Sequence, residues 1–394
     1  MNIASRRQER GRLGTGRDPA LVAHAAMAAA VLVTIGCGGP GQLAAHDPSS
    51  AIVQDASTPS ASPGRVAVAS HGGSADAATS PSATQARVFD VRDGTPWIAY
   101  QWGDDQGGDG IFLVRPDGTG RHQLVTDMSG QQWQPDWSPD GRRLAFIEDT
   151  PDDRNELWMV DIDGQHARKL WSCDVPCNSI SYPDWTPADP GAIYFAQDAD
   201  AGPDAPPTTF RVSRLDIGSG RVRTVLTRTD GATAEQPRIS HDGKRVAYMR
   251  FRDILDESAG SAIFVADLKG GRERRLTPWN LFGAGPDWLP DGRIVFNSYA
   301  LFLFNEGDTG PANLYVMRSD GSHRSRITDF TQVNTGATQA RVVPGGTAIA
   351  FTRVDPGEGV RRLARVDPAG RHERWLTSVP TFGTHPDVRP TGAP

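Results

Sequence analysis

Cysteine is the residue type whose spacing in this chain most directly suggests chemistry. The three cysteines are Cys37, Cys173 and Cys177, and three residues separate the last two. In an oxidising compartment this spacing predicts a disulfide that closes a small loop, whereas a reducing compartment would leave two free thiols. A zinc site is disfavoured, because two thiols without a second pair or a nearby histidine do not complete a zinc coordination shell.

The residues before Cys37 have the pattern of an export signal. Five arginines lie within the first 17 residues, and the mostly apolar run Ala20–Ile35 leads to Gly36 and Cys37. A short apolar run after basic residues is typical of a secretory signal rather than of a membrane span. With a small residue directly before the cysteine, the segment resembles a bacterial lipoprotein signal. The resemblance implies that residues 1–37 are a signal segment, that Cys37 receives a lipid and that the exported protein is anchored in the cell envelope; ordinary cleavage nearby is the alternative.

Residues 38–85 have the composition of a tether. They are mainly Ala, Ser, Gly, Pro and Thr, and none of the 10 Trp, 6 Tyr and 14 Phe residues precedes Phe89. A segment without aromatic residues has little from which to build a core, so we predict a disordered linker. A coil of this length reaches roughly 35–40 Å, far enough to hold a domain clear of a membrane.

Charge and hydropathy exclude two further classes of protein. The net charge of −6 argues against a general nucleic-acid binder. The chain contains no apolar run of about 18 residues, the length that an ordinary membrane-spanning helix needs. Contact with a membrane is therefore expected through the lipid anchor alone.

Residues 86–394 are built from a repeat. One element is Pro135–Gly141, with the sequence Pro-Asp-Trp-Ser-Pro-Asp-Gly, followed by the apolar run Leu144–Phe146. Related copies begin at Pro183, Pro237, Pro286 and Ala340, a degenerate copy begins at Phe89 and a truncated copy begins at Pro386. A second element, an apolar run followed by Asp-Gly, alternates with the first, as in Ile111–Val114.

Each repeat unit reads as four short antiparallel strands, which we name A to D. Ser-Pro-Asp-Gly is a turn between two apolar runs, and Asp-Gly in the second element makes another hairpin. Asp136 and Asp387 are five repeats apart, which gives about 50 residues per unit and six units in the region. The prediction is an all-β fold, a six-bladed β-propeller of four-stranded antiparallel blades. Trp137, Trp185 and Trp288 are expected to pack between blades.

The element Pro135–Gly141 with its following strand resembles the TolB-type β-propeller repeat, which also occurs in the propellers of prolyl-oligopeptidase-like enzymes. The resemblance implies a six-bladed propeller, often located in the bacterial envelope, and it implies no single biochemical activity. Within this family TolB itself is a periplasmic protein-interaction partner. Residues 386–390 look like a closing strand that joins the last blade to the first.

In the predicted propeller, acidic and basic residues gather on opposite faces. The B–C and D–A loops are expected on one face, and the A–B and C–D turns on the other. The six B–C loops carry 18 Asp or Glu against 5 Arg or Lys, whereas the six C–D turns carry 17 Arg or Lys against 9 Asp or Glu. The acidic face could complement a basic partner or a cation, and a solvated surface is the alternative.

The D–A loops are expected to bring amide and aromatic side chains to the mouth of the axis, where they would suit a peptide or a glycan. These candidate binding residues are Gln131, Gln132, Trp133, Asn178, Glu235, Gln236, Trp279, Asn280, Phe282, Asn334, Phe382 and His385. The alternative for each of them is a role in capping strand ends.

Catalytic patterns are missing from the sequence. There is no Gly-x-Ser-x-Gly element of a serine hydrolase. Five histidines fall in expected hairpins, namely His122, His166, His241, His323 and His372, which leaves His385 near the axis. One histidine cannot build a metal site. We therefore predict no catalytic residue, no cofactor and no metal.

Three hypotheses of function follow from these patterns. The first is a lipid-anchored, non-catalytic propeller that binds an envelope protein or a glycan and no nucleic acid. The second is a metal-dependent, carbohydrate-active propeller that resembles polysaccharide lyases. The third is a purely structural component of the envelope.

Overall fold

The computed structural model describes residues 94, 96–102, 110–152, 154–199, 209–228, 234–252, 260–269, 272–298, 310–332, 335–355, 361–377 and 383–391. The predicted signal segment 1–37 with Cys37, the linker 38–85 and the candidate residues Asn334 and Phe382 lie outside these ranges. Among the described residues, no helix is long and apolar enough to cross a membrane.

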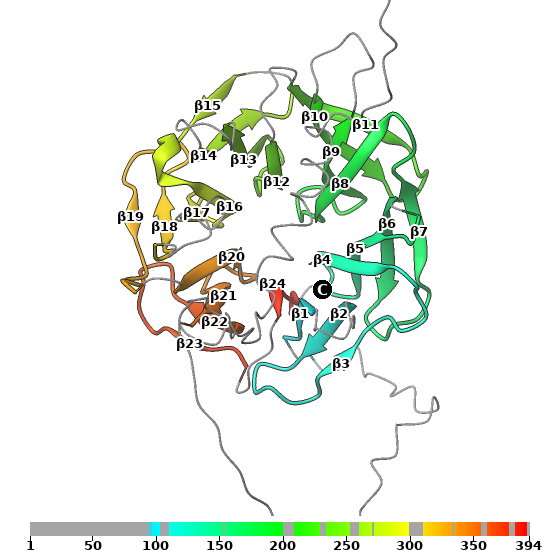
Figure 1. The fold of residues 1–394 in the computed structure, drawn as a ribbon, viewed down its shortest axis with the longest axis horizontal. Coiled ribbons are helices and arrows are strands. Elements are labelled where there is room, and N and C mark those ends of the chain that lie inside the picture. The colour runs from blue at the N-terminus through cyan, green and yellow to red at the C-terminus, as the bar shows by residue number, and fades with distance from the viewer. Residues whose placement is uncertain are drawn as a thin grey trace, which may run out of the picture. The chain divides into compact units, whose positions relative to one another are not determined.

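The described part is a ring of six four-stranded antiparallel sheets, as the repeat predicted (Figure 1). Blade 1 holds β24 (Thr384–Val388), β1 (Ile98–Trp102), β2 (Gly110–Val114) and β3 (His122–Gln123), and blade 2 holds β4 (Gln131–Trp137), β5 (Arg143–Asp149), β6 (Asn155–Asp161) and β7 (Arg168–Ser172). Blade 3 holds β8 (Cys177–Asp184), β9 (Ala192–Ala199), β10 (Thr209–Asp216) and β11 (Val222–Arg228), and blade 4 holds β12 (Ala234–Ile239), β13 (Arg245–Arg252), β14 (Gly260–Asp267) and β15 (Glu273–Arg275). The short 3-10 helix η1 (Trp279–Leu281) leads to blade 5, with β16 (Gly283–Trp288), β17 (Ile294–Ser298), β18 (Leu314–Met317) and β19 (Ser325–Arg326). Blade 6 holds β20 (Gly336–Val342), β21 (Ile349–Val354), β22 (Arg361–Val366) and β23 (Arg374–Trp375).

The two ends of the repeat region close the ring within blade 1. Strand β24 is the innermost strand of that blade and pairs with β1, with Val388 opposite Ile98 and Asp387 opposite Ala99. Figure 1 shows the red β24 beside the blue-green β1. The predicted role of residues 386–390 as a closing strand is therefore confirmed.

The turn after each innermost strand follows from its sequence. In blade 2 the Ser138 hydroxyl donates to Asp140 at 2.6 Å and accepts from the backbone N–H of Arg143 at 2.9 Å. Gly141 has φ 63°, a conformation that glycine adopts without strain, and a Cβ at this position would lie 2.5 Å from the carbonyl oxygen of Pro390. The turn is therefore tight and also packs against the closing segment.

The hydrophobic core is divided among the contacts between neighbouring blades. The described buried residues form six apolar clusters, and each cluster joins two adjacent blades. Trp137, Trp185 and Trp288 are buried in three of them, as predicted. The indole N–H of Trp137 donates to the carbonyl of Asp387 at 3.1 Å, and that of Trp288 donates to the carbonyl of Arg238 at 2.9 Å. A single blade buries neither of its faces, so stability requires the closed ring.

Candidate functional site

The ring has two faces, which the strand direction defines. On the loop face the innermost strands begin, as at Gln131 and Cys177, and here the B–C loops and D–A connections lie. On the hairpin face the innermost strands end, and here the A–B and C–D turns lie, as at Gly141 and Gly321. The candidate binding residues of the D–A connections therefore belong to the loop face.

Each innermost strand contains a β-bulge at the same place. The six equivalent residues have φ between 52° and 58°, and they are Gln134, Tyr182, Gln236, Gly285, Gln339 and His385. The strand register shifts at each of them. In five of the six strands the next residue is a proline, as in Gln134-Pro135. Proline has no N–H to donate and fits a bulge on an edge strand, which explains the proline at these five positions.

The bulges carry one layer of hydrogen bonds between blades. The glutamine side chain of every second bulge accepts the backbone N–H of the bulge residue in the next blade. The pairs are Gln134 with Tyr182 at 2.7 Å, Gln236 with Gly285 at 2.5 Å, and Gln339 with His385 at 3.0 Å. These amides are therefore committed to holding blades together.

Aspartates form a second layer of bonds between blades, nearer the hairpin face. Each carboxylate accepts a backbone N–H from the following blade. The pairs are Asp136 with Trp185 at 2.6 Å, Asp184 with Ile239 at 2.6 Å, Asp287 with Val342 at 2.7 Å, and Asp387 with Trp137 at 2.8 Å. In blades 4 and 6 the equivalent positions hold Arg238 and Arg341.

Arg238 balances part of this buried negative charge. Its Nη1 lies 2.8 Å from Asp136 Oδ1 and 3.2 Å from Asp184 Oδ1, and it also donates to the Pro183 carbonyl at 3.1 Å. Burial still raises the pKa of Asp184 to about 7, against the attraction of Arg238 and with the repulsion of Asp136. Arg341 forms no ion pair with any described residue. Arg238 is therefore the main counter-charge of the axis.

His385 lies buried at the axis, with a side chain that is 4% exposed. Its ring is 5.9 Å from that of Tyr182. Burial and the charge of Arg238 lower the pKa of His385 to about 3, so its imidazole is neutral near pH 7. No group of three or more His, Cys, Asp or Glu side chains among the described residues could hold a metal ion.

The candidate residues of blades 2 and 3 separate into exposed and committed side chains. Gln131 and Asn178 are exposed near the starts of β4 and β8. Gln132 is 1% exposed and accepts the N–H of Ile111 from blade 1 at 3.3 Å. Trp133 is half-buried and packs on the cluster between blades 2 and 3.

The candidates around η1 lie over the outer strands of blade 4. Trp279 packs against Phe264 of β14, with ring centroids 5.5 Å apart, and the guanidinium of Arg252 lies 4.5 Å from its ring. Asn280 is exposed, and Phe282 is half-buried with φ 52°. The structure thus brings Gln236 and His385 to the axis and places these three residues with blade 4.

A disulfide joins Cys173 and Cys177 on the loop face, as their spacing predicted. Both cysteines are buried, and they hold the connection between β7 and β8. Between them Val175 is 95% exposed, the most exposed large hydrophobic side chain of the described residues. The covalent bond therefore presents an apolar tip on a five-residue loop.

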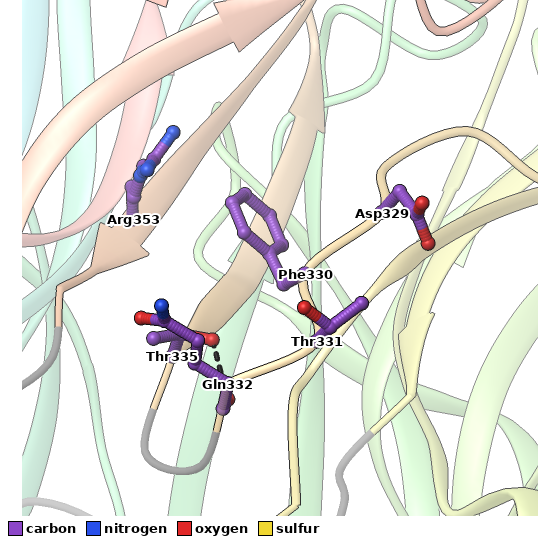
Figure 2. A pocket seen from close by; sticks show the side chains of 6 residues that line it. All are labelled: Asp329, Phe330, Thr331, Gln332, Thr335 and Arg353. Carbon is purple, nitrogen blue, oxygen red and sulfur yellow. Dashed lines mark hydrogen bonds between the residues drawn. The ribbon is translucent and has the colours of Figure 1, made fainter.

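A pocket of about 250 Å³ lies on the loop face beside the connection from blade 5 to blade 6. Figure 2 shows its lining, which is Asp329, Phe330, Thr331, Gln332, Thr335 and Arg353. The guanidinium of Arg353 lies 4.8 Å from the Phe330 ring, and its Nε is 3.0 Å from Asp355. Arg353 also pairs with Glu373. The one cation of this pocket is therefore already neutralised within the protein.

A titratable carboxyl with an altered pKa lies where β12 begins. Burial, together with the charge of Asp198 on β9, raises the pKa of Glu235 to about 8. Glu235 thus holds its proton at neutral pH. The backbone of Glu235 is opposite Met249 in blade 4, and Asp198 belongs to blade 3.

Comparisons with known proteins agree with this geometry. A family model described as the lipoprotein LpqB beta-propeller domain matches residues 113–275. TolB from Acinetobacter baumannii superposes with a TM-score of 0.58 at 16% identity, over 75% of this chain and 67% of TolB. The fold is therefore a β-propeller like that of TolB. A putative TolB from Agrobacterium tumefaciens superposes on this propeller with a TM-score of 0.51 at 20% identity, over 74% of this chain and 91% of that protein.

Two curated relatives match parts of this chain. The uncharacterized protein Atu1656 of Agrobacterium fabrum is 26% identical over 229 residues, which are 56% of this chain and 65% of that protein. The uncharacterized peptidase YuxL of Bacillus subtilis is 27% identical over 184 residues, which are 46% of this chain and 24% of that protein. The chain thus spans less than two thirds of the length of both relatives.

Two features of the site were not anticipated from the sequence. The Pro-Asp pair recurs in four repeats, at Asp136, Asp184, Asp287 and Asp387, and this recurrence was the available signal for the aspartate layer. The acceptor role of these aspartates was hidden, because three of the partner N–H groups lie about one repeat away and that of Asp387 lies 250 residues away. The exposure of Val175 had a weaker signal, an apolar residue inside the short interval between two cysteines.

Proposed function

We propose that this chain is a non-catalytic, envelope-anchored TolB-type propeller that binds a protein partner with its loop face. The observation that carries the proposal is the disulfide-held loop with Val175 at its tip. A nearly fully exposed apolar side chain does nothing for the core. It gains free energy only when a partner covers it.

The disulfide makes this loop suitable for binding. A loop that is already fixed loses little conformational entropy when a partner closes over it, so more of the contact energy appears as affinity. The neighbouring Asp174 is also exposed, with 71% of its side chain accessible, and Asn178 follows the loop. The apolar tip therefore has a polar surround, which is the usual pattern of a protein-binding patch.

The axis supports a role without catalysis. The four axial aspartates each accept a backbone N–H from the next blade, and the three bulge glutamines do the same. Groups that hold the blades together are poorly placed to exchange protons with a substrate during turnover.

A location in the envelope is supported by three observations. The chain is similar to the lipoprotein LpqB propeller domain and to TolB. Its N-terminal residues have the pattern of a lipoprotein signal that ends at Cys37. The disulfide between Cys173 and Cys177 fits an oxidising compartment. A lipid on Cys37 would supply the anchor.

The test is cross-linking capture from envelope fractions of the source cells, with the full chain carrying its signal and linker. Val175→Ser should lose the captured protein, and Trp375→Ser should keep it, because Trp375 is an exposed apolar residue of an outer strand, 40% accessible. Equal capture by both variants would contradict the proposal. Capture that a glycan-digesting enzyme abolishes would reassign the ligand to a glycan.

A second candidate function, carbohydrate cleavage, rests on the pair Glu235 and Asp198. Burial and the charge of Asp198 raise the pKa of Glu235, and a carboxyl that keeps its proton at neutral pH is the form that a general acid needs. The test is incubation of the chain with acidic oligosaccharides, with and without divalent metal. Product formation that Glu235→Gln abolishes would establish this candidate, and no product with either protein would remove it.

A further inference from the structure

Two adjacent hairpins of the hairpin face carry a cluster of unpaired positive charge, which we call the basic rim. It consists of Lys269, Arg272 and Arg274 from blade 4 and Arg318 and Arg324 from blade 5, all of them exposed. None of the five forms a side-chain hydrogen bond or an ion pair with any residue that the structure describes. These five cationic groups are therefore exposed without a hydrogen bond or ion pair to the described part of the chain.

The two hairpins lie next to each other. The hairpin of blade 5 packs on blade 4, where a Cβ on Gly321 would come within 2.9 Å of the Leu276 carbonyl oxygen. In addition, Arg245 of blade 4 donates to the Ser319 hydroxyl of blade 5 at 2.9 Å. The five cations therefore form one continuous surface.

Two acidic residues of these hairpins form hydrogen bonds or ion pairs within the protein. Asp320 accepts the Ser322 N–H of its own turn at 2.9 Å. Glu273 pairs with Arg228 at 3.1 Å and with Arg250 at 3.2 Å. Hydrogen bonds from Ser322 lower the pKa of Asp320, and the charges of Arg274 and Arg318 add to this. Asp267 and Asp320 are the exposed acids in the described part of the two hairpins. The five cations of the basic rim outnumber these two acids, so the surface is positive although the whole chain has a net charge of −6.

The same feature continues around the ring. Exposed cations without a side-chain partner among the described residues stand on the outermost strands of three other blades, at Arg168, Arg223 and Arg374. The predicted excess of basic residues in the C–D turns is therefore present as accessible charge on the hairpin face.

The chain also joins the propeller on the hairpin face. Trp97 leads directly into β1, which begins at Ile98. Ile98 is opposite Val388 and Val114, the last residues of β24 and β2, and both of these strands end at the hairpin face. The Trp97 carbonyl accepts the Arg389 N–H at 2.8 Å, and the Arg115 guanidinium lies 4.6 Å from the Trp97 ring. The described chain therefore enters β1 from the hairpin face, the face that carries the basic rim.

We propose that the hairpin face docks on an anionic phospholipid bilayer, with the basic rim against the headgroup phosphates. This inference rests on the proposed envelope anchor, and it fixes the orientation of the proposed function: the loop face with Val175 points away from the bilayer toward its partner. Stable attachment generally takes two signals, and a lipid chain plus a polybasic patch is one such pair. Each cation near an anionic surface strengthens binding about fivefold.

Vesicle co-sedimentation tests the docking with the full chain carrying Cys37→Ser, so that binding reports the protein surface alone. The probes are vesicles of phosphatidylglycerol mixed with phosphatidylcholine, and vesicles of phosphatidylcholine alone. The chain should bind the anionic vesicles and release them at about 1 M salt, where screening shortens the Debye length to about 3 Å. With the neutral vesicles the chain should remain in the supernatant.

A matched pair of variants locates the surface. Arg274→Glu with Arg324→Glu should weaken binding to anionic vesicles by about 30-fold or more, because two cations are removed and two anions are added. Arg154→Glu with Arg252→Glu makes the same charge change at two exposed positions of the loop face and should change binding less than about threefold, since screening makes distant charges weak. The melting temperature of each variant checks that it is folded.

Three outcomes would overturn the docking: no binding by the parent chain, equal binding to neutral vesicles, or equal loss in the two variants. The result is separable from that of the proposed function. Partner capture that depends on Val175 without vesicle binding would remove the docking alone. Vesicle binding that depends on the basic rim without partner capture would remove the proposed loop-face function alone.

Discussion

The charges of the axis and the charges of the basic rim follow opposite rules. At the axis, Asp136 and Asp184 are buried, and each meets a backbone N–H of the next blade and the guanidinium of Arg238. On the rim, Arg274 and Arg324 are exposed and form no hydrogen bond or ion pair with a described residue. Buried charge has to be satisfied by the protein itself, whereas exposed charge is satisfied by water.

The difference separates residues that build the propeller from residues that are available to other molecules. Removing a buried charge leaves its partners unpaired in a medium of low dielectric constant, so the effect appears in stability. Removing a rim charge leaves nothing unpaired, so the effect appears in binding. The following predictions test this division, beginning with the largest effect.

Arg238→Met should give the greatest loss of stability, about 3–5 kcal/mol, because it leaves two buried carboxylates without their counter-charge. The measurement is urea unfolding followed by tryptophan fluorescence. Arg341→Met is the matched control, since Arg341 occupies the equivalent position of blade 6 without an ion pair to any described residue, and its loss should be clearly smaller. Equal losses would show that Arg238 is not the main counter-charge.

Asp387→Ala should weaken ring closure by about 1–3 kcal/mol, because the Trp137 N–H of blade 2 loses its acceptor inside the protein. Unfolding in urea reports the change. Asp267→Ala, which removes an exposed carboxylate, should stay within about 0.5 kcal/mol of the parent chain. A neutral result for Asp387→Ala would mean that the closing strand does not depend on this bond.

Removing the disulfide with Cys173→Ser and Cys177→Ser should lower the free energy of unfolding by about 2 kcal/mol, the value of the chain-entropy model for so short a loop. Thermal unfolding with and without reductant measures it, and reductant should destabilise the parent chain alone. If reductant affects both proteins equally, the loop is not held by the covalent bond.

Glu235 should make the propeller less stable as the pH rises. Its pKa is raised in the folded chain, from an ordinary value of 4.5 to about 8, so between these values the folded state binds a proton that the unfolded state releases. Stability then falls with rising pH by at most about 1.4 kcal/mol per pH unit. Glu235→Gln should remove this contribution, as urea unfolding at several pH values would show. A parallel pH profile in both proteins would contradict the raised pKa.

Arg274→Gln with Arg324→Gln should have the smallest effect on stability, within about 0.5 kcal/mol, although it weakens vesicle binding. Unfolding in urea is again the measurement. A loss comparable to that of Asp387→Ala would place these two arginines in the fold and would end the distinction between axis and rim.

Much of the fold could be predicted from the repeat. The Ser-Pro-Asp-Gly turn after Trp137, the burial of Trp137 and Trp288 and the closing strand at 386–390 are local or periodic features, and all are present. For the candidate binding residues, the sequence indicated that they lie in the D–A connections but not which atoms they contact. Gln132 accepts a backbone N–H of the preceding blade and Gln236 accepts one of the next blade, because the packing of neighbouring blades and, at Gln236, a left-handed bulge set their direction.

The sequence by itself determined the number of blades, the positions of their turns and the pairing of two cysteines, because turn residues and apolar alternation act over a few residues and recur at each copy. Tertiary structure decided which charges meet. Arg238 reaches Asp136, 102 residues earlier, only because the ring brings blades 2, 3 and 4 to a common axis. The ring also decided that the chain joins the propeller on the hairpin face. Such contacts depend on three-dimensional closure, and no residue spacing along the chain encodes them directly.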